Sequence, residues 1–129
     1  MLAYLSSEWL AALQAAADDS PSLRAATAGV HLVVQQIITG GPHGDVAYHV
    51  VVDDGVTTVR AGHAEGPTIT FTQDRDTAIA VGRGDLSAQG AFMTGRIRVR
   101  GDLPKLVEQH AALAGVDDVF ASVRGSTEY

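Results

Sequence analysis

The sequence predicts a domain of mixed helices and strands (α/β; more closely, α+β). Five strands are expected, with helices before, between and after them. Three observations carry this prediction: an apolar helical stripe opens the chain, runs rich in β-branched residues recur between 30 and 72, and strict alternation is found at 96–100. Apolar residues three or four positions apart mark one face of a helix, whereas alternation marks a half-buried strand. The expected order is therefore helices, four strands, two helices, one strand and one helix.

The first helix is indicated by Ser7, which precedes the sequence EWL, and by the apolar period that surrounds it. The apolar residues with the spacing of one helical face are Leu5, Trp9, Leu13 and Ala16. Pro21, within DDSPS, then stops or redirects the chain before a second short helical segment that ends near residue 28.

Residues 30–60 favour three successive strands joined by turns. β-branched residues dominate VHLVVQQII, VAYHVVV and VTTVR, and turn-forming residues separate these runs in TGGPHGD and DDG. A fourth strand is expected over 68–72, where Ile69 and Phe71 point to one side and three threonines to the other.

Two helical segments are expected before the fifth strand. An Ala-rich helix over 77–82 follows an aspartate that can cap it. Ser87 is a second cap, and it opens a short helix that carries Phe92 and Met93 and closes at Gly95.

The fifth strand, RIRVR, places Ile97 and Val99 on one side and three arginines on the other. We expect the arginines to face water and to protect an edge strand, although contact with an anionic head group or a membrane surface is an open alternative. One last helix is expected after Asp102, and its stripe comprises Leu103, Leu106, Val107, His110 and Ala114.

Composition narrows the classes of function. A chain of 129 residues, 46% hydrophobic and 19% charged, fits a single domain over residues 1–129, and 124–129 are expected to be a frayed tail. The net charge of −6 argues against nucleic acid as a partner. The chain has no cysteine and no recognisable signal peptide or membrane span, so a cytoplasmic protein without stable membrane insertion is expected, as monomer or homodimer.

Catalytic and metal-binding patterns are sparse in the sequence. The five histidines show no metal-ligand spacing, and no serine stands in a hydrolase motif, so we expect no metal, no cofactor and no enzyme activity. The Asp117–Asp118 pair is interpreted as capping and solubilising a helix end. His110 lies on an apolar stripe, where it is either a buried, hydrogen-bonded imidazole or the polar anchor of a pocket.

One segment has a specific resemblance to a known family. GDLSAQGAFMTGRIRVRGDL, residues 84–103, closely resembles the signature of the sterol carrier protein type two family, a lipid-binding fold. The match is carried by the order and spacing of Ser87, Gln89, the AFM triplet, Gly95 and the RIRVR alternation. The resemblance extends over nearly the whole chain. Gly90 departs from the family pattern, in which this position usually holds a helix-favouring residue. Glycine inside a helix costs about 1 kcal/mol of helix stability, so the short helix is expected to be less stable here.

The resemblance implies a five-stranded mixed, mostly antiparallel sheet covered on one face by about five helices, with an apolar cavity between sheet and helices. Gln89 would supply a polar contact to a ligand head group, and Phe92 and Met93 would form part of an adaptable wall. The same side chains would look identical in a filled core. The candidate lipid-binding residues are Trp9, Leu13, Phe71, Ile79, Gln89, Phe92, Met93, Ile97, Val99, Leu106, Val107 and His110.

The leading hypothesis is a non-catalytic carrier of a hydrophobic small molecule such as a fatty acid, a fatty acyl thioester or a sterol, with transient membrane contact allowed. The alternative is a protein–protein interaction or dimerisation module of the same fold, which a solid core with an exposed apolar patch would favour. An enzyme acting on a hydrophobic substrate would need a perturbed ionisable group inside the cavity, and His110 is its candidate.

Overall fold

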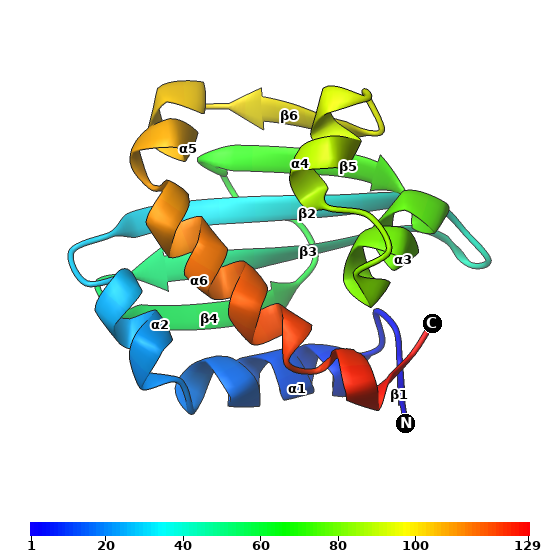
Figure 1. The fold of residues 1–129 in the computed structure, drawn as a ribbon, viewed down its shortest axis with the longest axis horizontal. Helices are drawn as coiled ribbons and strands as arrows, with labels where there is room; N and C mark the ends of the chain where they lie inside the picture. Colours follow the sequence, from blue (N-terminus) through cyan, green and yellow to red (C-terminus); the bar gives the residue numbers. More distant parts are fainter.

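The computed structural model describes all of residues 1–129, and its centre is one mixed five-stranded sheet with the strand order β4-β3-β2-β5-β6 (Figure 1). The strands are β2 (His31–Gly41), β3 (Gly44–Asp53), β4 (Val56–Ala61), β5 (Ile69–Asp74) and β6 (Ile97–Gly101). β2 and β5 pair in parallel, and the other neighbours are antiparallel. The predicted mixed, mostly antiparallel sheet is confirmed.

The six α-helices pack against the sheet from its front face and along its β4 edge (Figure 1). They are α1 (Ser7–Asp18), α2 (Pro21–Ala26), α3 (Arg75–Arg83), α4 (Ala88–Met93), α5 (Leu103–Glu108) and α6 (His110–Ala121). Side-chain oxygens cap the first five by accepting hydrogen bonds from backbone N–H groups, and the caps are Ser6, Ser20, Asp74, Ser87 and Asp102. No helix combines the length and apolar character that a membrane span requires.

The single last helix expected from the sequence is wrong, because the chain breaks at Gln109 into α5 and α6. Gln109 has φ −105° and ψ 25°, outside the helical region, and it ends α5 while it begins α6. The apolar stripe predicted across this point therefore does not lie on one continuous face. α6 crosses the sheet diagonally, and α5 stands over the end of β6 (Figure 1).

The helix-facing side of the sheet is built by cross-strand rows. One row runs Tyr48, Gln36, Phe71, Val99 through β3, β2, β5 and β6. Beside it on β3, Val50 and Val52 are fully buried under the helices together with Leu13 of α1. Alternation along each strand thus decides which side chains meet the helix layer.

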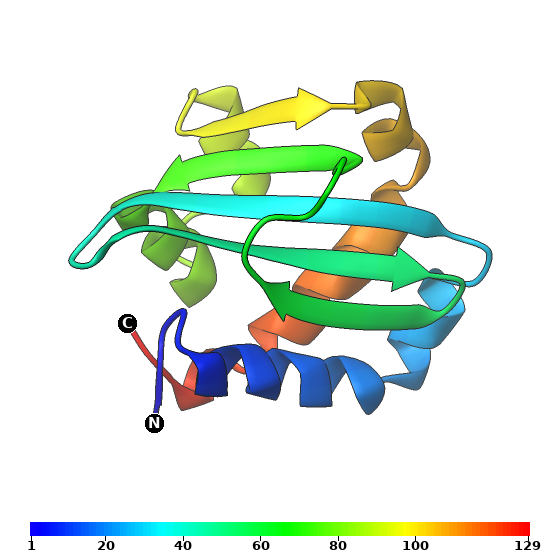
Figure 2. The same ribbon diagram turned by 180° about the vertical axis from the view of Figure 1, so that it is seen from behind.

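The other face of the sheet is partly covered by the connection from β4 to β5, which crosses behind β3 and β2 (Figure 2). Gln35, buried on β2, holds this connection: its Oε1 accepts from Ala64 N at 2.7 Å and its Nε2 donates to Gly62 O at 3.2 Å. Nearer the β6 edge, Arg98 and Arg100 are exposed on this face, as the alternation predicted.

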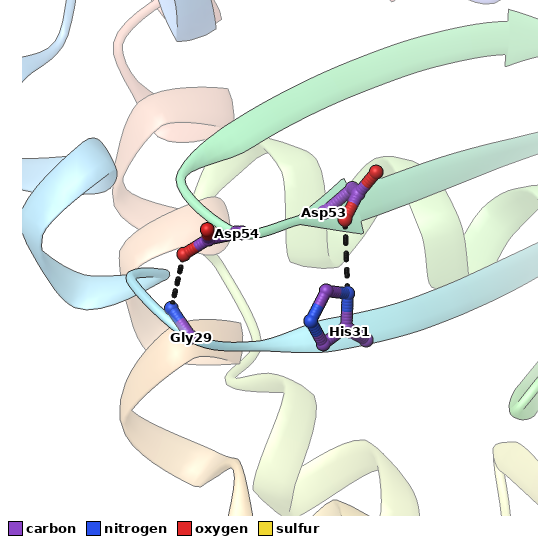
Figure 3. A network of polar contacts seen from close by, with 4 residues as sticks. All are labelled: Gly29, His31, Asp53 and Asp54. Carbon is purple, nitrogen blue, oxygen red and sulfur yellow. Dashed lines mark hydrogen bonds and ion pairs between the residues drawn. The ribbon is translucent and has the colours of Figure 1, made fainter.

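A small polar network joins the start of β2 to the turn between β3 and β4 (Figure 3). Gly29 N donates to Asp54 Oδ1 at 2.7 Å, and His31 Nδ1 lies 2.9 Å from Asp53 Oδ1. Both side chains of the His31–Asp53 pair are 70% exposed, so the pair adds little stability. The Gly29–Asp54 hydrogen bond links the turn between β3 and β4 to the residues before β2.

The C-terminus differs from the frayed tail that was expected. β7 (Thr127–Glu128) pairs in parallel with β1 (Leu2–Ala3), and the two chain ends lie close together (Figure 1). Thr127 is buried, and the Tyr129 ring packs 4.9 Å from that of Tyr4. The tail is ordered because it pairs with the N-terminus, a contact between distant segments that local composition does not reveal.

Replacement of Gly101 by alanine should destabilise the fold strongly. Gly101 has φ +112°, and an added Cβ would lie 2.3 Å from the backbone oxygen of Thr68, the residue before β5. We expect a loss of about 2–4 kcal/mol in urea unfolding. Gly95→Ala is the matched control: Gly95 has φ +78° but open space around it, so about 1 kcal/mol is expected. Equal losses of unfolding free energy in the two variants would show that Gly101 has room for a Cβ atom and would contradict the prediction.

Candidate ligand cavity

A cavity of about 600 Å³ lies between the helix layer and the β5–β6 half of the sheet. Its floor is formed by helix-facing side chains of four strands, which are Tyr48, Gln36, Phe71, Gln73, Ile97 and Val99. Its walls come from α3 and α4 and from α5 and α6, and the residue after β7 also contributes. Of the 23 lining residues, 14 are hydrophobic, so the hollow favours an apolar occupant.

The hollow exists because small residues stand where the helices face one another. α3 contributes Ala78 and Gly82 to the wall, and α6 contributes Ala121. On α4, the fully buried Ala91 lets the helix sit close to the sheet, while Phe92 beside it lines the cavity. Short side chains leave a volume that the neighbouring backbones cannot close by moving together.

An aromatic cluster lies at the end of the cavity near the two termini. Tyr4 packs at 4.9 Å from both Trp9 and Tyr129, and Trp9 packs at 5.6 Å from Tyr48. The cluster joins the N-terminal turn, α1, β3 and the C-terminus. Gly82 makes room for it, since a Cβ there would lie 2.9 Å from the Tyr129 ring. Burial raises the pKa of the Tyr4 and Tyr48 phenols, which therefore stay neutral.

Two glutamine amides lie on the floor of the cavity. Gln73 Nε2 donates to Gln36 Oε1 at 3.4 Å, and Gln73 Oε1 is buried without a hydrogen-bond partner. The cavity is thus apolar over most of its surface but has a polar strip across β2 and β5. Such a combination suits a ligand with a long apolar part and one polar group.

Asp117 of α6 contributes a carboxyl group to the cavity. Burial, and secondly the charge of Asp118, raises the pKa of Asp117 to about 6. Much of its side-chain surface is accessible, but the residue lines the hollow, where protein atoms surround it on several sides. No hydrogen bond or ion pair stabilises the ionised form. The predicted capping role is wrong because Asp117 lies inside α6 rather than at its end.

Half of the predicted lipid-binding residues line the cavity. These are Phe71, Gln89, Phe92, Ile97, Val99 and Leu106. Trp9 and Leu13 instead belong to the packed core beneath α1, and Ile79 of α3 is not among the lining residues.

The other three lie on the outside. Met93 is 75% exposed because the inner side of the short α4 is occupied by Ala91. Val107 is 73% exposed, and His110 is exposed, with its Nδ1 3.1 Å from Val107 O. The predicted stripe placed Val107 and His110 on the inner face of one continuous helix. Because the chain breaks at Gln109, both residues face outward instead.

Several lining residues were not predicted as site residues, although some had a signal. Gln36 alternates with Val34 and Ile38 in an apolar run, and Gln73 continues the face of Ile69 and Phe71. No comparable signal marks the residues that the tertiary structure brings in, which include Tyr4, Asp117, Phe120, Arg124 and Tyr129.

Comparison with known proteins decides the family. The family model described as the SCP-2 sterol transfer family matches residues 10–114. The chain belongs to the SCP-2 sterol transfer family. Membership confirms the resemblance drawn from the segment 84–103. A search of curated proteins finds no significant match.

Solved structures of SCP-2 proteins share the fold. A crystal structure of sterol carrier protein 2 has a TM-score of 0.77 at 19% identity, covering 92% of this chain and 97% of that one. A solution structure from Thermus thermophilus, described as possibly a sterol carrier protein, has a TM-score of 0.74 at 20% identity, covering 92% and 88%. Palmitated SCP2L2 from Aedes aegypti gives 0.61 at 21% identity, covering 85% and 94%.

Asp117→Asn should stabilise the protein at neutral and alkaline pH. The rise of the pKa from 3.8 to about 6 would correspond to roughly 3 kcal/mol without screening, and water in the open hollow reduces the expected gain to about 1–2 kcal/mol. The folded carboxyl binds its proton more tightly than the unfolded one, so the wild-type penalty is complete above pH 6 and vanishes towards pH 4.

Urea unfolding of both proteins at pH 8 and at pH 5 measures this effect. The stability difference between Asp117→Asn and wild type should be smaller at pH 5 than at pH 8. A variant that is less stable at both pH values would mean that the carboxylate makes favourable contacts in the fold.

Proposed function

We propose that this SCP-2 protein is a non-catalytic carrier that binds one hydrophobic small molecule in its cavity. The observation that carries the proposal is the hollow of about 600 Å³ lined mainly by hydrophobic residues. Cavities of about 300–1,000 Å³ with apolar walls and a few polar groups are typical of small-molecule sites. Each methylene of a ligand that enters such a site contributes about 0.8 kcal/mol.

The ligand's apolar part is proposed to lie over β5 and β6. Phe71 and Val99 stand opposite each other in the sheet register, with Ile97 one position further along the inner face of β6. Leu106 from α5 and Phe92 from α4 also line this part of the cavity. Gln89 is exposed on α4 and also lines the cavity, where it could contact a polar group of the ligand. The SCP2L2 structure from Aedes aegypti is described as palmitated, which supports a lipid ligand for the fold.

The two other hypotheses have less support. The interaction module was expected to have a solid core, and a hollow of this size does not fit it. The enzyme hypothesis relied on His110, which lies outside the cavity and faces solvent. Transient membrane contact stays a prediction, and the exposed apolar side chains of α4 and α5 would favour it; these are Phe92, Met93, Leu103 and Val107. The cytoplasmic location also stays a prediction.

Filling the cavity should abolish binding without damaging the fold. Ala121→Trp places an indole at the wall of the hollow, whereas Ala111→Trp places one on the exposed side of the same helix. N-phenyl-1-naphthylamine, an uncharged fluorophore, should bind wild type and Ala111→Trp saturably at one per chain. Its affinity for Ala121→Trp should fall by at least about tenfold.

Thermal unfolding provides the second measurement for these variants. An indole that enters empty space leaves the melting temperature of Ala121→Trp unchanged or raised, whereas overpacking of a filled core costs about 1–3 kcal/mol. Absence of saturable binding to the wild-type protein would contradict the carrier proposal. So would equal affinities of the two tryptophan variants.

A further inference from the structure

The polar groups inside the cavity carry an inference about which ligands it accepts, and this inference rests on the proposed function. Three of them form a group that we call the polar cluster: Gln36 on β2, Tyr48 on β3 and Asp117 on α6. Gln36 and Asp117 also line a small adjoining hollow of about 70 Å³, so they lie near each other across the gap between sheet and helix. Tyr48 pairs with Gln36 in the register of β2 and β3 and lines the same cavity.

The polar cluster has hydrogen-bonding capacity that the protein does not use. The amide of Gln36 accepts one hydrogen bond from Gln73 through its oxygen, and its nitrogen donates to no protein atom. The Asp117 carboxylate likewise has no protein donor. A polar group that lacks a partner in a partly dehydrated site costs free energy, which a ligand that supplies the partner would recover.

The cavity wall carries more negative than positive charge. Asp117 and Asp118 face a single cationic lining residue, Arg124. The Nε of Arg124 donates to the backbone oxygen of Gly82 at 2.6 Å, and Arg124 forms no ion pair with either aspartate. The whole chain also carries a net charge of −6. An anionic ligand group would therefore meet two carboxylates and one guanidinium, an excess of negative charge.

We propose that the polar cluster makes the cavity selective for uncharged lipids whose polar end is a hydroxyl or amide, and that Asp117 excludes lipid carboxylates. A hydroxyl can donate to the Asp117 carboxylate and accept from the free Gln36 nitrogen at the same time. A ligand carboxylate can accept from Gln36 but is repelled by the negative charge of Asp117, a repulsion that a hydroxyl does not meet. Asp117 is thus a specificity-determining residue.

The test compares two ligands with the same alkyl chain, dodecan-1-ol and dodecanoate, as competitors of bound N-phenyl-1-naphthylamine at pH 8. Wild type should bind the alcohol at least about tenfold more tightly. The alcohol loses less hydration than the carboxylate on binding, and this alone favours it in any apolar cavity. The decisive quantity is therefore the change in the alcohol-to-carboxylate affinity ratio on mutation of Asp117. Asp117→Asn should raise the affinity for dodecanoate about tenfold and change that for the alcohol less than about threefold.

Asp85→Asn is the matched control, because Asp85 is exposed, does not line the cavity and makes no side-chain hydrogen bond. It removes the same net charge and should leave both affinities unchanged. Asp117→Leu is a second variant, which also removes the charge and should raise dodecanoate affinity. Melting temperatures of all variants show whether each is folded.

A pH series provides an independent arm. The ionisable groups that line the cavity besides Asp117 are Asp118, Arg124, Tyr4, Tyr48 and Tyr129, and no ionisable side chain of β2, β5, β6, α3, α4 or α5 lines it. Arg75 and Arg83 lie over the Tyr4 and Tyr129 rings. Wild-type affinity for dodecanoate should rise as the pH falls from 8 to 5.5, where Asp117 gains its proton while the ligand is still largely ionised. Asp117→Asn should show a smaller rise, which comes only from the protonated fraction of the ligand.

The outcomes separate this inference from the proposed function. Saturable binding of the fluorophore with an alcohol-to-carboxylate ratio that neither Asp117 variant changes would overturn the selectivity and leave the carrier proposal standing. Tighter binding of dodecanoate than of the alcohol by wild type at pH 8 would overturn it as well. Failure of the fluorophore and both ligands to bind wild type would contradict the carrier proposal itself.

Discussion

The parallel pairing of β2 with β5 is the constraint on which the rest of the structure depends. Parallel neighbours cannot be joined by a tight turn, so the chain after β4 must travel back across the sheet before β5 begins. It does so behind the sheet, where Gln35 holds the crossing segment by hydrogen bonds to its backbone (Figure 2). Because this connection lies behind the sheet, the helices cover the front face. They pack densely over one half of that face and leave a hollow over the other half.

The half formed by β3 and β4 is a dense core, and the half formed by β5 and β6 is hollow. α1 packs on β4, and its Leu13 has no exposed surface. Over β5 and β6, the short α3, α4 and α5 stand around the sheet, and small residues face the space between them. A bound apolar ligand would complete the second half of the core, so the same burial that stabilises folding would supply affinity. The aspartate and amides inside the hollow would then decide which polar group enters.

The sheet was predictable because apolar and polar residues alternate along its strands. The helix layer was less predictable. Period two placed Phe71, Ile97 and Val99 on the inner face because a strand offers each side chain only two directions. A helix offers many directions, and its orientation depends on tertiary packing. The break at Gln109 could not be read from the apolar period, and therefore Val107 and His110 were assigned to the wrong side. The role of Asp117 depends on neighbours that are distant in the sequence, and such neighbours are not visible in a local pattern.

The position of the ligand in the cavity can be tested most directly by paramagnetic NMR. An uncharged nitroxide-labelled lipid should broaden methyl signals of the cavity wall, which are those of Val81, Leu86, Val99 and Leu106. Methyl signals of Leu103 and Val107 on the exposed side of α5 should broaden less. Broadening confined to Leu103 and Val107, with the wall signals unchanged, would show that the lipid binds to the surface and would contradict the account.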